Sequence, residues 1–179
     1  MYIDKATAIR LTEKQIEVYE TLLSCVPAIE EVVRKFDGKV ANKRIETALQ
    51  EIHHGIFFRR NQNSENWELT ITEWENRYVQ GEPDKSGYRG MHYVSQNTLY
   101  LAEEYSGHFM ADGGRLIADK LIEQIERKRE SYARDVETMK DQLYRVDSLI
   151  ARRDEIYKMR HEFNNSINCF LEEYFNLKA

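Results

Sequence analysis

The sequence contains few residues that interrupt helices or cross-link the chain, and it lacks any long apolar run. Its 179 residues include only two prolines and two cysteines. The absence of a run of about 18 apolar residues excludes an ordinary membrane-spanning helix, and no apolar segment of the secretory type opens the chain. We therefore predict a cytoplasmic protein in which the widely separated Cys25 and Cys169 are buried free thiols rather than a disulfide.

An excess of positive charge is missing as well. The formal net charge is -5, and acidic residues outnumber basic ones both before and after residue 110. Proteins that grip nucleic acid through its phosphates alone are usually basic, so the composition argues against such binding but still allows a local basic patch. The mean hydropathy of -0.70 predicts much exposed surface, which fits an elongated helical protein.

The sequence also lacks recognisable catalytic and metal-binding motifs. Glu51 and His54 form one E-x-x-H pair, whereas carboxylate-bridged di-iron bundles use two such pairs and two further glutamates. Phosphate-binding loops, nucleophile elbows and zinc-knuckle cysteine spacings do not occur. The G-x-x-G spacing from Gly87 to Gly90 is found in KH-type RNA binders, but here it precedes a predicted strand, so we interpret it as a turn. We predict no catalytic residue, no metal site and no cofactor, and we expect a non-enzymatic protein.

What the sequence does contain is one long helical stretch. Neither Gly nor Pro occurs after Gly114, and apolar residues at steps of three and four are typical of a coiled coil. We predict that this seam forms a homodimer; the alternative is a helical hairpin within the chain, after a break or kink at residues 164–166. The seam consists of Val136, Met139, Leu143, Val146 and Ile150.

Three short helices and a small sheet are predicted to precede this stretch. The first helix spans residues 4–26 or begins at Thr12, the second spans 28–36 and ends at Gly38, and the third is capped by Asn42 and ends near Gly55. Alternating apolar residues then predict strands at 56–60, 67–74 and 91–95, the second of them half-buried, with loops at 61–66 and 81–90. Residues 97–105 fit either a strand or a helix.

The predicted fold is therefore mainly α with a small antiparallel β-sheet (α+β). Its domains are residues 1–113, which hold the short helices and the sheet, and residues 114–179, which hold the long coiled-coil-like C-terminal helix and serve as a dimerisation arm.

Aromatic and arginine side chains concentrate in the predicted strand region. Such residues dominate binding energy at protein interfaces, and they also stack on unpaired bases. We expect Trp67, Tyr93 and either Phe57 or Phe58 to lie in the core. The residues predicted to contact a partner are Arg59, Arg60, Glu73, Trp74, Arg77, Tyr78, Tyr88 and Arg89.

Acidic residues lie among these aromatic side chains in the sequence. They favour a protein partner with a basic surface over unpaired bases, because opposite potentials speed encounter. They are Glu65, Glu68, Glu73, Glu75, Glu82 and Asp84.

The segment from Phe36-Asp37-Gly38-Lys39-Val40-Ala41-Asn42-Lys43-Arg44 through Ile52 resembles segments of small uncharacterised proteins of phages and integrative elements. The resemblance brings no catalytic residues and implies only a setting, that of accessory proteins of mobile elements. Many of these, the anti-CRISPR proteins among them, disarm bacterial immunity. We therefore expect a protein that binds and inhibits a host defence protein, such as a CRISPR effector. The alternative is a dimeric protein that binds single-stranded nucleic acid.

Overall fold

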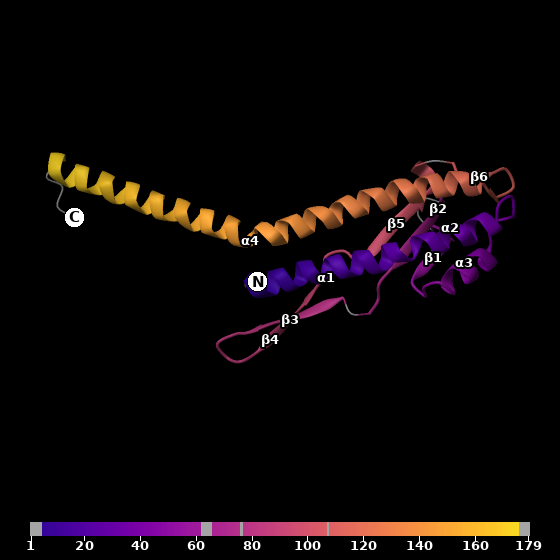
Figure 1. Ribbon diagram of the computed structural model, residues 1–179, viewed down its shortest axis with the longest axis horizontal. Helices are drawn as coiled ribbons and strands as arrows, with labels where there is room; N and C mark the ends of the chain where they lie inside the picture. The colour runs from indigo at the N-terminus through magenta and orange to yellow at the C-terminus, as the bar shows by residue number, and fades with distance from the viewer. Residues whose placement is uncertain (1–4, 62–65, 76, 107, 176–179) are drawn as a thin grey trace. The chain divides into compact units, whose positions relative to one another are not determined.

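The computed structural model describes residues 5–61, 66–75, 77–106 and 108–175, with the backbone only at residues 106, 147, 149, 150, 153 and 168–175 (Figure 1). The chain divides into two compact units, Met1–Lys140 and Asp141–Ala179. Helices and small antiparallel sheets are combined in one chain, which confirms the predicted α+β class. None of the described helices is long and apolar enough to cross a membrane.

Three helices open the chain, as predicted: α1 (Lys5–Ser24), α2 (Val26–Lys35) and α3 (Lys43–Gln50). Gly38 follows α2 with a φ of 67°, a conformation that favours glycine. Asn42 caps α3 by accepting a 2.9 Å hydrogen bond from the backbone N of Arg44. The alternative start of α1 at Thr12 is wrong, because the Thr12 hydroxyl donates within the helix to the carbonyl of Ala8.

The central sheet has three antiparallel strands in the order β1–β2–β5, formed by β1 (Ile56–Arg60), β2 (Trp67–Thr72) and β5 (Thr98–Glu103). The ambiguous segment 97–105 is thus mainly a strand, followed by the short 3-10 helix η1 (Glu104–Ser106). The prediction of a half-buried β2 is wrong, because Thr70 and Thr72 are buried as well as Leu69 and Ile71. The Thr72 hydroxyl is satisfied there by that of Thr98 on β5, at 3.0 Å.

A separate hairpin consists of β3 (Tyr78–Pro83) and β4 (Arg89–Tyr93). The predicted loop at residues 81–90 is therefore wrong except at its centre. Gly81 and Pro83 are breakers in a regular strand, but the pairing shifts register between Gln80 and Pro83, and such irregularities accommodate both residue types. A second, two-residue hairpin joins β6 (Met110–Ala111) to β7 (Arg115–Leu116).

The helix α4 (Ala118–Phe175) begins where Asp37 Oδ1 accepts a 2.9 Å hydrogen bond from Ala118 N, rather than at Gly114. The helix continues through residues 164–166, so the first of the two alternatives for this segment, a break rather than a kink, does not occur. The Ser166 hydroxyl donates to the carbonyl of Glu162 at 3.0 Å, one way in which a polar residue is accommodated inside a helix.

The core of the first unit lies between the helices and the central sheet. Leu22, Ile29 and Leu49 of the three N-terminal helices and Leu101 of β5 are fully buried, together with Ile125 of α4. In Figure 1, α1 lies alongside the first part of α4, and the rings of Tyr19 and Tyr132 meet edge to face between these helices, with centroids 5.7 Å apart. The first part of α4 therefore packs with the residues that precede it.

Candidate protein-binding surface

The β3–β4 hairpin has one covered face and one exposed face. Tyr78 pairs with Tyr93, and Val79 pairs with His92. Side chains alternate along a strand, so Tyr78, Met91 and Tyr93 share one face while Val79 and His92 share the other. The first group is exposed, with 52% of Tyr78 and 63% of Tyr93 accessible, whereas Val79 and His92 are half-buried. The hairpin therefore presents an apolar, aromatic face to solvent.

Polar side chains of α1 hold this hairpin. The buried hydroxyl of Thr7 accepts a 3.3 Å hydrogen bond from the backbone N of Glu82, and Arg10 forms a 2.8 Å ion pair with the Glu82 carboxylate. At the other end of the hairpin, buried Gln15 accepts a 3.1 Å hydrogen bond from the backbone N of Gln96, just after β4. These contacts position both ends of the hairpin on α1.

Arg77 connects the hairpin to the loop that follows β2. Its guanidinium carbon lies 5.8 Å from the ring centroid of Trp74 and 6.0 Å from that of Tyr93, and the Tyr93 ring meets Tyr78 at a steep angle, 6.4 Å away. Contacts of these kinds contribute about 0.5–1.5 kcal/mol each, so they favour this arrangement of the side chains in the free protein. We term Trp74, Arg77, Tyr78, Met91 and Tyr93 the aromatic face.

Hydrogen bonds to backbone carbonyl groups fix the base of the aromatic face. Glu73 N donates to the carbonyl of Asn97 at 2.8 Å, and the Asn97 side-chain amide donates back to the Glu73 carbonyl at 2.6 Å. Val94 N donates to the carbonyl of Arg77 at 2.9 Å. The loop that carries Trp74 is therefore tied to the segments on both sides of it.

Two of the predicted partner-binding residues lie away from this face, on β1. Arg60 pairs with Trp67, the first residue of β2, whereas Trp74 follows the last residue of that strand. Arg59 stacks 5.0 Å over the ring of Phe57 and lies 3.8 Å from the Glu68 carboxylate. The structure therefore does not bring Arg59 and Arg60 together with the aromatic face.

Tyr88 and Arg89 lie at the tip of the hairpin, opposite its base. Arg89 pairs with Pro83, near the turn, and Tyr88 is exposed. Of the predicted residues, Trp74, Arg77 and Tyr78 thus belong to the aromatic face, and Glu73 lies at its base. Tyr88 and Arg89 lie at the far end of the hairpin.

Sequence reasoning missed Met91 and misplaced Tyr93. Tyr93 was expected in the core but is exposed, since β4 pairs only with β3 in a ribbon outside the central sheet. The spacing of Met91 and Tyr93, two residues apart around His92, was the available signal that they share a face. Trp67 is half-buried and stacks on the buried ring of Phe58 at 5.0 Å.

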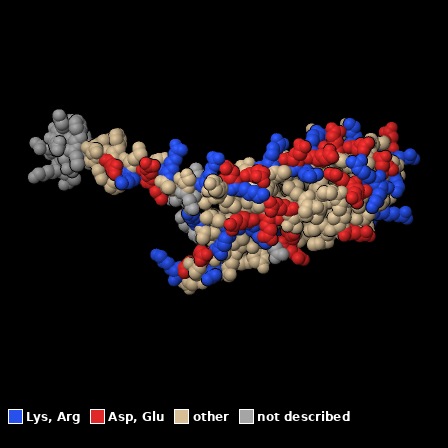
Figure 2. All heavy atoms as spheres, viewed as in Figure 1, with Lys and Arg blue, Asp and Glu red and all other residues tan. Residues whose placement is uncertain are grey.

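Two of the six predicted acidic residues lie near arginines of the same chain. Glu82 pairs with an arginine of α1, and Glu68 lies near an arginine of β1. Glu65 lies outside the described residues. Glu73 and Glu75 are left beside Trp74, so the expected acidic surface is smaller than the sequence indicates. Figure 2 shows acidic and basic side chains intermingled over the first unit on the side in view.

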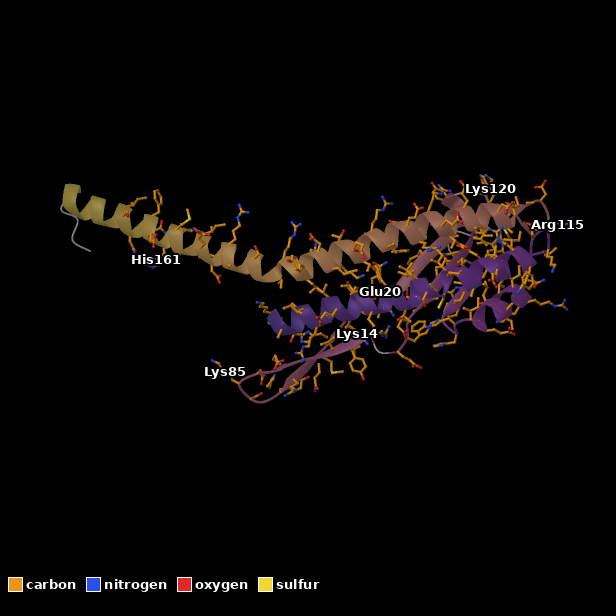
Figure 3. All side chains as sticks on the ribbon, in the orientation of Figure 1. Lys14, Glu20, Lys85, Arg115, Lys120 and His161 are labelled. Atoms are coloured by element: carbon orange, nitrogen blue, oxygen red, sulfur yellow. The ribbon has the colours of Figure 1, made fainter. Side chains whose placement is uncertain are left out.

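The tip of the hairpin is organised by Asp84. Its carboxylate accepts hydrogen bonds from the Ser86 hydroxyl at 2.6 Å and from the backbone N of Ser86 and Tyr88 at 2.8 and 3.0 Å. These bonds, led by that from the Ser86 hydroxyl, lower the pKa of Asp84. Lys85 projects outward at the tip (Figure 3). From Lys85 to Leu101 the sequence contains no acidic residue, whereas Glu82 and Asp84 directly precede this stretch.

The predicted dimerisation seam is partly used within the chain. Val136 is buried, and one turn further on Lys140 forms a 3.0 Å ion pair with Glu20 of α1. Val136 is therefore covered within the chain, where α1 packs against α4. Met139, Leu143 and Val146 are half-buried, and the side chain of Ile150 lies outside those described.

No likeness to a known protein assigns a role to the aromatic face. No protein-family model, curated protein or solved structure matches the chain. Among the described residues, no group of three or more His, Cys, Asp or Glu side chains is arranged to hold a metal ion.

Proposed function

We propose that this chain is a non-enzymatic protein that binds and inhibits another protein through its aromatic face. The observation that carries the proposal is the packing of Arg77 between the exposed rings of Trp74 and Tyr93. Trp, Tyr and Arg are the residues that dominate interface energies. Contacts that favour one arrangement of these side chains before binding reduce the entropy lost on binding.

The same packing favours a protein partner over single-stranded nucleic acid. Stacking on bases uses free ring faces, and Arg77 lies over one face of Trp74 and one face of Tyr93. Nucleic-acid binding is the second candidate, supported by the acid-free stretch from Lys85 to Leu101. It predicts gel shifts of oligonucleotides at low salt that weaken as salt rises.

The target we propose is a host defence protein, such as a CRISPR effector. The support for this class of target is the resemblance of residues 36–52 to proteins of phages and integrative elements. Glu68 and Glu82 are paired with arginines of the same chain. The contacts therefore support binding of the target through the aromatic face and not through a broad acidic surface.

A capture experiment tests the binding function. The tagged chain is incubated with lysate of bacteria that carry defence systems, and captured proteins are identified by mass spectrometry. We expect Trp74→Ala and Tyr93→Ala to weaken capture of the target at least about tenfold, because hot-spot truncations cost about 2 kcal/mol or more. Tyr105→Ala is the matched control, since Tyr105 is 84% exposed and lies outside the aromatic face.

Circular dichroism checks that each variant is folded. Undiminished capture by both aromatic-face variants contradicts the proposal, as does turnover of nucleotides or nucleic acid by the purified protein.

We also propose that the distal part of α4 forms a coiled-coil homodimer. Ile156, Met159, Phe163 and Ile167 are all exposed, and their spacing of three, four and four residues places them along one side of the helix. A single long helix gains most of its stability from packing of such a stripe. Phe163→Glu should yield monomers in light scattering, whereas a wild-type chain that is monomeric at tens of micromolar would end this proposal.

A further inference from the structure

An arginine lies among the exposed apolar residues of the distal part of α4. Arg160 follows Ile156 by four residues and precedes Phe163 by three, the steps that recur in a coiled coil. At about 100° per residue, Ile156, Phe163 and Ile167 lie within about 20° of one direction around the helix, and the arginine lies about 40° from it. All four side chains are exposed, and we term them the distal stripe.

A parallel pair of helices would bring like charges together on the distal stripe. Residues of an in-register parallel coiled coil meet their own counterparts, so Arg160 would face Arg160 of the second copy between apolar layers. Like charges placed opposite each other are destabilising, and a charge that is taken out of water without a partner costs more. The parallel direction is therefore disfavoured at the centre of the stripe.

An antiparallel pair avoids this contact. The order of residues then reverses about a midpoint, and a midpoint between residues 161 and 162 matches Ile156 with Ile167 of the second copy. The same midpoint matches Arg160 with Phe163, which places an arginine beside an aromatic ring, a favourable cation–π pairing. One midpoint thus gives a suitable neighbour to all four residues of the distal stripe.

This midpoint also divides the charges of the distal helix by sign. Residues 150–161 contain four Lys or Arg and two Asp or Glu, a net charge of +2 with His161 neutral, whereas residues 162–173 contain three Glu and no Lys or Arg, a net charge of -3. Lys158 and Glu162, 3.9 Å apart in the same helix, offset each other, and without them the two halves still differ in sign. An antiparallel pair sets the basic half of each chain against the acidic half of the other.

The acidic residues of the basic half lie away from the distal stripe. By position around the helix, Glu155 is about 100° and Asp154 about 160° from the centre of the stripe, whereas Arg152 is only about 40° from it, on the side opposite Arg160. Glu173 follows Arg152 by three heptads, so both occupy the same flank of a coiled coil. An antiparallel pair brings like flanks of its two helices together, and with them these opposite charges.

We infer that the distal part of α4 pairs with a second copy of this chain in the antiparallel direction, with the midpoint between residues 161 and 162. This inference rests on the homodimer proposed above and specifies the direction and register of its helices. Charged residues beside the interface commonly decide the orientation of coiled-coil partners, and here they act together with Arg160 at its centre.

Disulfide trapping in the full-length chain determines the direction. Both natural cysteines are replaced, as Cys25→Ser and Cys169→Ser, and Ile156→Cys and Ile167→Cys are then made separately. These two positions are about 16 Å apart along one helix, whereas a disulfide requires Cα atoms about 4.4–6.8 Å apart. We expect a cross-linked dimer when the two variants, carrying tags of different size, are mixed and oxidised, and no cross-link with either variant alone.

The other outcomes separate this inference from the homodimer itself. Cross-linking of each variant alone shows parallel helices, which overturns the antiparallel direction and retains the homodimer. Dimers in light scattering without a cross-link in the mixture overturn the proposed register. A wild-type chain that is monomeric at tens of micromolar refutes the homodimer and the antiparallel direction with it.

Charge reversal provides an independent test without new cysteines. Glu172→Lys combined with Glu173→Lys makes the acidic half basic, so the dissociation constant of an antiparallel dimer should rise at least about tenfold at low salt. Adding Arg152→Glu and Arg153→Glu reverses the other half as well and should restore most of the affinity. In a parallel dimer the first two changes would instead relieve repulsion between two acidic halves. Circular dichroism checks that the helix is retained, and failure of the second pair of changes to compensate the first overturns the inference.

Discussion

Replacing Gln15 tests whether α1 positions the aromatic face. This buried side chain makes three hydrogen bonds to the segment after β4: Oε1 accepts from Gln96 N at 3.1 Å and from the Ser95 hydroxyl at 3.3 Å, and Nε2 donates to the Gln96 carbonyl. A hydrogen bond contributes about 1 kcal/mol net, and a buried group left unpaired costs about 1–3 kcal/mol. We therefore expect Gln15→Ala to lower the free energy of unfolding by about 2–4 kcal/mol.

The isosteric change Gln15→Glu tests the hydrogen bond that Gln15 donates separately from the two that it accepts. It retains both accepted hydrogen bonds but places a carboxylate oxygen against the Gln96 carbonyl. Burial and this repulsion should raise the pKa of the new carboxyl in the folded state above its unfolded value. The contribution of a group with a raised pKa is present below the unfolded pKa and is lost as pH rises through the folded one. The deficit relative to wild type should thus be greatest at neutral pH and smaller near about pH 4.

Urea denaturation at both pH values measures these effects. Glu13→Ala, at an exposed position of the same helix, is the control and should stay within about 0.5 kcal/mol of wild type. Capture of the partner by Gln15→Ala should weaken as well, since the base of the hairpin is less fixed. If Gln15→Ala is as stable as the control, α1 does not hold the hairpin through this residue.

Three further predictions concern single residues. Gly55→Ala should destabilise the fold by about 3 kcal/mol in urea denaturation, because an added Cβ would lie 2.0 Å from the backbone carbonyl oxygen of the last residue of β2. Asp37→Ala should cost about 1 kcal/mol by loss of the cap on Ala118 N, and Asp37→Asn should recover most of it. The pKa of His53 is lowered by burial and by the neighbouring His54, and its Nδ1 accepts from Gly55 N at 3.1 Å. Its contribution to stability is therefore present above about pH 6.5 and lost as pH falls through the lowered pKa, a loss that pH-dependent melts of His53→Asn should lack.

The chemistry of neighbouring residues was sufficient to predict the short N-terminal helices. Pro27 in the first turn of α2, Gly38 with its positive φ and Asn42 as the cap of α3 each act within a few residues of their own position. The β3–β4 hairpin was not predictable in this way. Gly81 is buried, and a Cβ there would lie 2.8 Å from His92 Nε2 on the paired strand, so the reason for this glycine appears only once the two strands are brought together.

The part of the candidate site that comes from residues close in sequence was predictable, whereas the part that depends on tertiary structure was not. Trp74, Arg77 and Tyr78 are close in sequence, and the structure keeps them together. Arg60 was grouped with them by proximity in sequence, but the antiparallel register places it at the opposite end of β2 from Trp74. Tyr93 has the pattern of a core residue, and its exposure depends on whether β4 joins the central sheet or forms a ribbon with β3 alone, which is a tertiary choice.

The position of the aromatic face depends on α1 more than on the long helix that dominates the sequence. Two of the residues that α1 buries are polar: Thr7 accepts a hydrogen bond from Glu82 N, near the tip of the hairpin, and Gln15 bonds to Ser95 and Gln96, just after β4. An apolar contact tolerates sliding, because burial has no direction, whereas a hydrogen bond to one backbone N–H is lost within about an ångström of displacement. Apolar residues at these positions would leave the backbone of Glu82 and Gln96 without partners. The polar pair therefore specifies where the hairpin lies, and with it the direction in which Tyr93 faces.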